Sequence, residues 1–480
     1  MIRTRFAPSP TGFLHIGGLR TALYAYAFTK SQGGKFLLRI EDTDRNRFVP
    51  GSVEKIYEIL KKFGLEWDEG PLVGGPYVPY VQSERVATGI YQKYAEKLIT
   101  DNHAYYCFCP PQTKDEIETE HNQGNIISRD ICRDLLPTEA RKRIANGEKP
   151  AIRLRVPENE IISFTDFVIK KEISWETKFV DEVMLLKSDG FPTYHLAAMV
   201  DDYEMKISHI IRGRDWLPST PAHLLIIKYL GFPRPEICHL TDILDPSGGK
   251  LSKRKGNVSC EEFLAEGYLP EAILNFIMLV GWAPKDNREL FTLEEFVANF
   301  QKGSLQIANP VFNRKKLDWF NGYYIRKKSD SELISLIRSN LSEAVIANFS
   351  LRPNNVNEDI LVKTVPLIKD RITKLSDFTS LAGFLFEKPK VDPSLFDSLS
   401  YKEHLSEAAA NLTNLTNWTN DGIQTSLTSL ISQKGWQTGD FYMSFRIALS
   451  GSKFTPPITQ SAEILGKEET LLRLNSLLRR

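Results

Sequence analysis

The chain of 480 residues lacks long apolar runs and has little cysteine. No stretch reaches the roughly 18 consecutive apolar residues that a membrane-spanning helix needs, and the polar N-terminal segment does not resemble a signal peptide. We therefore expect a cytoplasmic protein with no membrane partner. Five scattered cysteines in a chain of this length argue against a disulfide framework.

An excess of charge of one sign is also missing. The 61 lysines and arginines are balanced by 60 aspartates and glutamates, giving a formal net charge of +1. This balance excludes a uniformly basic surface, so any nucleic acid must be contacted through local patches. The length is enough for three or four compact units.

A glycine-containing segment near the N-terminus has the features of an anion site. A short strand is predicted over residues 2–7; Gly12 and the pair Gly17 and Gly18 follow, and apolar residues then recur at helical spacing. Glycine lets the backbone approach a ligand closely or adopt positive φ. The helix N-terminus favours phosphate, with His15 beside it. The alternative is a tight structural turn with a hydrogen-bonded loop histidine.

A second stretch between glycines is strongly basic. Lys250, Lys253, Arg254 and Lys255 supply four cations within six residues. The flanking glycines favour a mobile basic loop over a helix face, and such a loop can close on a phosphate ligand and open again.

These two stretches resemble the HIGH and KMSKS signatures of class I aminoacyl-tRNA synthetases, and read HIGG at residues 15–18 and KLSKR at residues 250–254. The motifs RFAPSPTG, RIEDTD, QSER, LLKSDGFPTYHLA and IRGRDWLPSTP are similar to those of the glutamyl-tRNA synthetase family. The resemblance is close over residues 1 to about 330 and looser beyond. It implies an enzyme, acting as a monomer, that uses ATP with Mg2+ to convert L-glutamate to glutamyl adenylate and then transfers glutamate to the 3' end of tRNA(Glu).

The resemblance also implies roles for individual residues. His15 and Lys253 would be catalytic, because a hydrogen bond to the reacting phosphate and a cation beside the departing pyrophosphate both stabilise the transition state. ATP would be bound by His15, Gly17, Gly18, Asp215, Lys250, Leu251, Ser252, Lys253 and Arg254. Glutamate would be bound by Arg5, Ala7, Ser9, Glu41, Tyr194 and Arg212.

The two arginines are the residues suited to reading a carboxylate, since a guanidinium binds it with two parallel hydrogen bonds. By resemblance, Arg212 would contact the substrate side chain with Arg5 beside it, while Glu41 would orient the amino end. Glutamine lacks the charge to satisfy buried guanidiniums, so its rejection can come from unpaired donors. The alternative for either arginine is a structural ion pair with Glu41 or Asp215.

Three cysteines are spaced as metal ligands. A C-x-C pair, Cys107 and Cys109, is followed by a C-x-D pair, Cys132 and Asp134. Thiolates suit a tetrahedral structural Zn2+, for which Asp134 would supply the fourth ligand. Some bacterial members of the family carry zinc at this position, but C-x-C is not the commonest zinc spacing, and buried reduced cysteines are frequent.

The order of predicted elements indicates an α/β Rossmann-like catalytic domain with an inserted α+β domain, followed by an all-α C-terminal region. By resemblance, the insertion would bind the tRNA acceptor end and the C-terminal region the anticodon, for which Trp418, Trp436, Arg371 and Arg446 are candidates. We divide the chain into the first catalytic half (1–85), the inserted acceptor-binding domain (86–182), the second catalytic half (183–245), a KMSKS-like loop and stem-contact domain (246–330) and a helical anticodon-binding domain (331–480).

Two other functions stay open at this point. A relaxed enzyme that also charges tRNA(Gln) would differ in a few anticodon contacts that the sequence does not locate. A catalytically silent tRNA-binding relative could dispense with His15 and Lys253, both of which are present. A glutaminyl enzyme is disfavoured, because that family resembles a β-barrel C-terminal region and this one has helical patterns.

Overall fold

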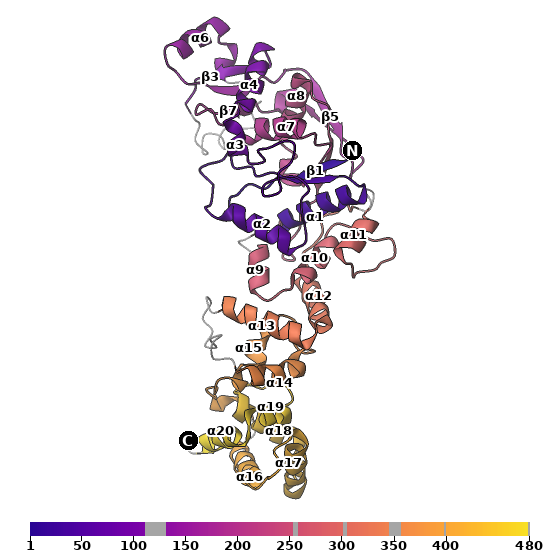
Figure 1. Ribbon diagram of the computed structural model, residues 1–480, viewed down its shortest axis with the longest axis vertical. Helices are drawn as coiled ribbons and strands as arrows, with labels where there is room; N and C mark the ends of the chain where they lie inside the picture. The colour runs from indigo at the N-terminus through magenta and orange to yellow at the C-terminus, as the bar shows by residue number, and fades with distance from the viewer. Residues whose placement is uncertain (111–130, 253–257, 301–304, 345–356, 398–399, 479–480) are drawn as a thin grey trace. The chain divides into compact units, whose positions relative to one another are not determined.

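The computed structural model describes residues 1–110, 131–252, 258–300, 305–344, 357–397 and 400–478, as Figure 1 shows. Two compact units are defined by internal contacts. The first is Met1–Glu261 with Leu274–Asn313, and the second is Glu262–Ile273 with Arg314–Arg480. The finer five-part division expected from the sequence stays a prediction.

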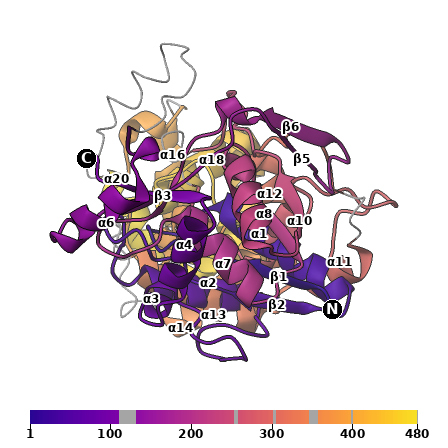
Figure 2. The same cartoon turned by 90° about the horizontal axis from the view of Figure 1, so that it is seen from above.

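Two pairs of parallel strands form the parallel part of the first unit. β1 (Arg3–Phe6) pairs with β2 (Lys35–Leu38), and β8 (His209–Gly213) pairs with β9 (Glu236–Leu240). The two pairs are adjacent, because the amide of Ser208 donates to the carbonyl oxygen of Arg3 at 3.0 Å. Parallel strands are what the alternation of strands and helices predicted. In Figure 2, β1 and β2 run side by side next to α1 (Ile16–Ser31), which packs on both.

Helix α1 begins earlier than the sequence analysis expected. Nδ1 of His15 accepts the amide of Gly17 at 3.0 Å and caps the helix, so both glycines of the pair lie in its first turn. Of the predicted loop glycines, only Gly12 has positive φ, at 138°. A Cβ on Gly18 would come within 2.9 Å of Leu14 Cδ1. A side chain at Gly18 would therefore require Leu14 to shift, and the backbone there is not left-handed.

The inserted segment forms an antiparallel sheet and a hairpin. The sheet has the order β3 (Ala104–Cys107), β4 (Ala151–Leu154), β7 (Met184–Leu186), and the hairpin joins β5 (Ile161–Thr165) to β6 (Glu172–Glu176). β7, at the start of the predicted second catalytic half (183–245), pairs with β4 of the predicted insertion. The reason is one shared apolar core, to which the inserted strands, α4 (Ile90–Thr100), α7 (Tyr194–Glu204) and α8 (Thr220–Leu230) all contribute.

Hairpin strand β5 lies against α8, as Figures 1 and 2 both show. The other elements of the first unit are α2 (Ser52–Lys62), α3 (Gln82–Val86), η1 (Ile131–Asp134), α6 (Pro137–Ala145), η2 (Thr177–Phe179), η3 (Arg214–Trp216) and α11 (Leu293–Asn299). The division between the units falls within α9 (Cys260–Ala265) and α10 (Pro270–Met278).

The second unit contains no strand among its described residues, in agreement with the predicted helical C-terminal region. Its helices are α12 (Arg314–Lys327), α13 (Asp330–Ala344), α14 (Glu358–Ile368), α15 (Asp377–Ala382), η8 (Gly383–Leu385), η9 (Pro393–Leu395), α16 (Tyr401–Thr413), α17 (Asn420–Lys434), α18 (Thr438–Ser450), α19 (Ile458–Leu465) and α20 (Lys467–Leu478). Buried Leu405, Phe441, Phe445 and Leu474 lie at the centre of the last five α-helices. In the described parts of the chain, no helix combines the length and the apolar character needed to cross a bilayer.

Candidate active site

A cavity of about 200 Å³ opens where β1 and β8 end. In open α/β sheets, ligands bind outside the carboxyl ends of the strands. The lining includes all six residues predicted to bind glutamate, namely Arg5, Ala7, Ser9, Glu41, Tyr194 and Arg212. Gly18, from the predicted ATP set, and Trp216 also line the cavity. The structure thus brings together side chains from distant parts of the sequence, such as Arg5 and Arg212.

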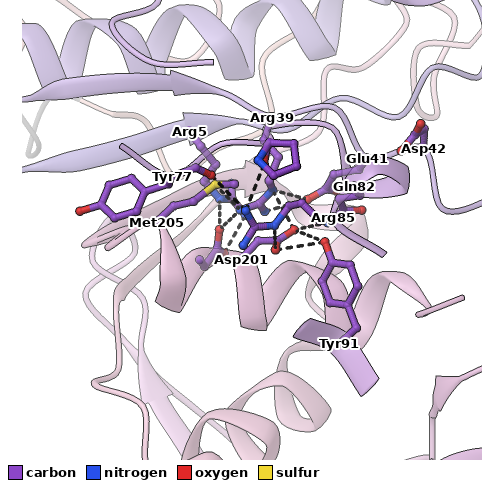
Figure 3. A network of polar contacts seen from close by, with 12 residues as sticks. Arg5, Arg39, Glu41, Asp42, Tyr77, Gln82, Arg85, Tyr91, Asp201 and Met205 are labelled. Atoms are coloured by element: carbon purple, nitrogen blue, oxygen red, sulfur yellow. Dashed lines mark hydrogen bonds and ion pairs between the residues drawn. The ribbon is translucent and has the colours of Figure 1, made fainter. Parts of the chain in front are cut away.

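A buried network of ion pairs fixes two of these residues (Figure 3). Nε of Arg5 lies 2.9 Å from Oδ1 of Asp202. Arg39 bridges two acids: its Nη1 lies 2.7 Å from the same Asp202 oxygen and its Nη2 2.8 Å from Oε1 of Glu41. The alternative of an ion pair between Arg5 and Glu41 is not observed. Arg5 pairs with Asp202, and Glu41 pairs with Arg39.

Burial and charge act against each other within this network. Burial raises the pKa of Glu41, and the nearby Arg39 only partly offsets this effect. The pKa of Asp202 is also pushed upward by burial, but Arg5 and Arg39 outweigh it and hold that pKa below its usual range. Asp202 is therefore the ionised counter-charge of both arginines.

The neighbouring Asp201 ties the helices behind the cavity together (Figure 3). Its carboxylate accepts hydrogen bonds from Nε2 of Gln82 (2.8 Å), Nε of Arg85 (2.7 Å) and the hydroxyl of Tyr91 (2.9 Å). These donors come from α3 and α4, whereas Asp201 is on α7. The position of Asp202 on the same helix turn is thereby fixed relative to α3 and α4.

Arg212 is held by neutral groups. Its Nη2 donates to Oγ1 of Thr220 (2.8 Å), its Nη1 bonds with Nδ1 of His223 (3.0 Å) and its Nε donates to Nε2 of His239 (3.1 Å). No carboxylate of the described residues forms an ion pair with it, so the expected alternative partners Glu41 and Asp215 do not neutralise Arg212. Burial lowers the pKa of its guanidinium. A buried cation with only neutral protein partners favours an anionic ligand.

An aromatic pair adjoins Arg212. The rings of Tyr194 and Trp216 stack with centroids 3.9 Å apart, and both line the cavity. Burial raises the pKa of Tyr194, so its hydroxyl stays protonated at neutral pH and can donate as well as accept a hydrogen bond.

The segment that follows the basic signature lies beside the start of α1. His15 forms an antiparallel bridge with Ser259, the amide of Ile16 donates to the carbonyl oxygen of Val258 (3.0 Å), and the amide of Cys260 donates to that of Leu14 (2.9 Å). Residues 258–260, beyond the basic loop, are therefore hydrogen-bonded to the segment that carries His15. Lys253 and Arg254, the central cations of the predicted loop, lie outside the described residues.

The N-terminal end of the basic loop carries a compensated charge. Lys250 forms ion pairs with Asp215 and with Asp242, the latter at 3.1 Å. Burial lowers the pKa of Lys250, but the two carboxylates outweigh burial and raise that pKa above its usual value. Leu251 is buried, its amide donates to the carbonyl oxygen of Ile243 at 2.9 Å, and the half-buried Ser252 follows. Asp215, predicted to flank the adenosine of ATP, is here the counter-charge of Lys250.

The three predicted cysteine ligands form one cluster. The sulfur atoms of Cys107, Cys109 and Cys132 all lie within 4.8 Å of one another, and those of Cys109 and Cys132 are 3.6 Å apart. Thiolates at the corners of a zinc tetrahedron are about 3.8 Å apart, given a Zn–S bond of about 2.3 Å. The geometry therefore fits zinc. Asp134 is exposed and does not belong to the cluster, so the structure does not bring the predicted fourth ligand to it.

Sequence reasoning missed several residues that hold the site together. They are Arg39, Asp202, Thr220, His223 and His239. The sequence contained a sign of one of these residues, Asp202. With its neighbour Asp201 it directly follows the apolar helical run Leu196–Val200, and acidic residues next to such a run are buried only when they are paired.

Comparison with known proteins agrees with this geometry. Residues 1–319 match the family model for the catalytic domain of class I tRNA synthetases (E and Q), and residues 332–478 match the model for an anticodon binding domain. The chain therefore belongs to the class I aminoacyl-tRNA synthetases, within the glutamate and glutamine group.

Full-length relatives define the activity. The glutamate–tRNA ligase of Treponema denticola is 39% identical over 500 residues, with 98% of both chains covered. That of Finegoldia magna is 39% identical over 495 residues and covers 100% of this chain and 99% of its own. A crystal structure of a glutamate tRNA ligase from Elizabethkingia meningosepticum in complex with its amino acid matches with a TM-score of 0.81 at 35% identity, covering 100% of this chain and 99% of that one. The activity of this chain is that of a glutamate–tRNA ligase.

Proposed function

We propose that the cavity at the ends of β1 and β8 binds L-glutamate, and that ATP with Mg2+ binds beside His15 and the basic loop. The α-carboxylate of glutamate attacks the α-phosphorus of ATP, which forms glutamyl adenylate and releases pyrophosphate. The terminal ribose hydroxyl of tRNA(Glu) then attacks the activated carbonyl carbon, and AMP leaves. One observation carries the assignment of the amino acid: Arg212 faces this cavity without a carboxylate partner among the described residues.

Each group of the amino acid has a complementary residue in the lining. Arg212 suits the side-chain carboxylate, with which a guanidinium forms two parallel hydrogen bonds. Glu41 suits the ammonium group, since one of its oxygens bonds to Arg39 and a carboxylate can accept further hydrogen bonds. Tyr194 and Ser9 add hydroxyl groups, and Arg5 adds a second positive charge.

His15 suits a phosphate oxygen. Its Nδ1 accepts the amide of Gly17, so the neutral ring carries its proton on Nε2. An N–H donor aimed at charge that develops on the α-phosphate stabilises the transition state, as a flexible lysine such as Lys253 does for pyrophosphate. Mg2+ bound with ATP would neutralise charge on the phosphates.

We also propose that Cys107, Cys109 and Cys132 hold one structural Zn2+. When bound, the ion would link β3 to η1 and stabilise the end of the inserted domain, which we propose contacts the tRNA acceptor end. The amide of Phe108 donates to Sγ of Cys132 at 3.4 Å, which suits a thiolate ligand.

Anticodon contacts are proposed for Arg371 and Arg446. Nη1 of Arg371 donates to the carbonyl oxygen of Thr455 at 3.5 Å, and Nε of Arg446 donates to Oγ1 of Thr455 at 3.1 Å. Neither forms an ion pair with a carboxylate in the described part of the chain. The adjacent Phe454 is 81% exposed, and single-stranded RNA bases stack on such rings. The other two candidates, Trp418 and Trp436, pack against the apolar core of this unit instead.

The test is aminoacylation with radiolabelled glutamate, using separately transcribed tRNA(Glu) and tRNA(Gln). Charging of tRNA(Glu) alone, lost in Lys253→Ala, would establish an enzyme that discriminates between the two tRNAs. Charging of both would establish the relaxed enzyme. Lys206→Ala, at an exposed site, is the control for Lys253→Ala and should charge like the parent protein. If the parent protein charges neither tRNA, the proposal is overturned in favour of a silent tRNA-binding relative. Sedimentation of the same sample tests whether the enzyme is a monomer.

A further inference from the structure

Arg212 differs from Arg5, the other arginine of the cavity, in the kind of group that holds it. Arg5 donates to the carboxylate of Asp202 at 2.9 Å. Arg212 instead engages two imidazole nitrogens, Nδ1 of His223 at 3.0 Å and Nε2 of His239 at 3.1 Å. Because an arginine side chain has only donors, each of these nitrogens must be an acceptor without a proton.

The tautomer of His239 follows from this bond. Its Nε2 accepts, so the proton of the neutral ring is on Nδ1, which lies 3.1 Å from Oδ2 of Asp166. Burial opposes ionisation of Asp166, but hydrogen bonds from His239 and from the amides of Val168 and Ile169 outweigh it and keep its pKa below the usual range. The nearest carboxylate on this side of Arg212 is therefore separated from it by a whole imidazole ring.

The tautomer of His223 follows in the same way. Its Nδ1 accepts from Arg212, so its proton is on Nε2, which lies 3.1 Å from Nδ1 of His195. Burial, and then the charge of Arg212, lower the pKa of His195 to about 4 and that of His223 well below its usual value. Both rings are neutral at physiological pH.

We propose that His223 and His239 are positioning residues that orient Arg212 without neutralising it, so that its charge is reserved for the side-chain carboxylate of glutamate. This inference rests on the proposed glutamate site. With Thr220, the two rings engage three of the five N–H donors of the guanidinium, and the hydroxyl of Tyr194 in the cavity lining is a further neutral hydrogen-bond partner. A carboxylate can meet the desolvation cost of the cation, whereas the carboxamide of glutamine cannot. The rings thereby contribute to the preference for glutamate.

The test compares two substitutions of similar size at the same position. His223→Gln keeps a neutral acceptor for Arg212, whereas His223→Glu gives it a carboxylate. The matched control is His103→Gln, which removes a ring that stacks on Tyr229 (3.7 Å) away from the cavity. KM for glutamate, KM for ATP, kcat and the ratio of kcat/KM for glutamate over glutamine are measured with saturating tRNA(Glu).

We expect His223→Glu to raise the KM for glutamate on the order of 100-fold and to reduce the glutamate to glutamine ratio by a similar factor, because a buried ion pair would compete with the substrate. The KM for ATP should stay within about threefold, and His223→Gln should resemble the parent. If His223→Glu keeps the parental KM and ratio, the inference is overturned. Arg212→Gln distinguishes failure of the histidine role from failure of the proposed glutamate site. An unchanged KM for glutamate in that variant would overturn the glutamate site itself.

A second measurement does not depend on the folding of any variant. Nitrogen-15 NMR of the histidine rings in the intact protein at pH 7.5 should find His223 neutral with its proton on Nε2 and His239 neutral with its proton on Nδ1. An imidazolium, or the opposite tautomer, at either position would overturn the inference.

Discussion

Oδ1 of Asp202 lies 2.9 Å from Nε of Arg5 and is the shared counter-charge of two buried arginines, because Nη1 of Arg39 lies 2.7 Å from the same oxygen. Asp202 has no direct role in the chemistry that we propose. It sets the position of Arg5 in the cavity and, through Arg39, that of Glu41.

Asp202→Asn should therefore destabilise the protein and weaken glutamate binding. Removing one partner of a buried ion pair costs roughly 3–5 kcal/mol, since it leaves a buried charge uncompensated. The control is Asp44→Asn, whose exposed pair with Arg47 should be worth at most about 1 kcal/mol. Urea unfolding followed by tryptophan fluorescence compares the two variants, together with the KM for glutamate. Equal unfolding midpoints would contradict the role assigned to Asp202.

His195, which lies 3.1 Å from Nε2 of His223, predicts a pH dependence of stability. The pKa of His195 is lowered by burial, and then by Arg212, to about 4, whereas in the unfolded chain it returns to about 6.5. Between these values the unfolded state binds a proton that the folded state does not. The contribution of the neutral His195 ring to the free energy of unfolding is thus fully present above pH 6.5. It is lost as the pH falls towards 4, at up to about 1.4 kcal/mol per pH unit.

Urea midpoints measured at pH 7.5, 6.0 and 5.0 check this expectation. The parent protein should lose stability as the pH falls, and His195→Gln should lose less over the same interval, because one proton-linked group has been removed. If both proteins show the same slope, His195 does not titrate as its surroundings imply.

The residues that line the cavity could be named from the sequence, because the motif residues Arg5, Glu41 and Arg212 lie at or just beyond the carboxyl ends of parallel strands. Asp202 could not be assigned a partner in this way. It is on a helix, and its pairing with Arg5 depends on how α7 packs against the sheet. Likewise, the pairing of β7 with β4 depends on the shared apolar core, which leaves no local signal at residue 183.

The cysteine cluster illustrates the same limit. Spacing identified the three thiols, but Cys132 and Asp134 lie in the 3-10 helix η1. In such a helix, residues two apart are on different faces, whereas in an extended C-x-D segment both would face one way. Asp134 is therefore exposed, while Cys132 is buried beside Cys107.

Metal content should consequently depend on Cys132 and not on Asp134. We expect about one zinc per chain in the parent protein and in Asp134→Ala, and little in Cys132→Ser, because loss of one thiolate from a structural site weakens binding severely. Cys260→Ser, at a buried thiol outside the cluster, is the control. Inductively coupled plasma mass spectrometry gives the stoichiometry. A parent protein without zinc, or a zinc-free Asp134→Ala, would contradict the proposed ligand set.

In the helical unit, Arg371 and Arg446 should govern the affinity for tRNA. The double variant Arg371→Ala with Arg446→Ala should raise the KM for tRNA(Glu) by on the order of 10- to 100-fold, given 1–3 kcal/mol for charged and stacking contacts to bases. The KM values for glutamate and ATP should not change, because the substituted residues contact neither substrate. The control is Arg338→Ala, an exposed arginine on α13 that pairs with Glu358.

Salt dependence then separates phosphate contacts from base contacts. If the arginines bind backbone phosphates, the slope of log Kd against log salt concentration should fall by about 0.7 for each arginine removed. If they read bases, affinity should fall for tRNA(Glu) with little change in slope, and substitution of anticodon bases should have a smaller effect in the double variant than in the parent. Unchanged affinity for tRNA(Glu) in the double variant would exclude both modes and place anticodon binding on another surface of this unit.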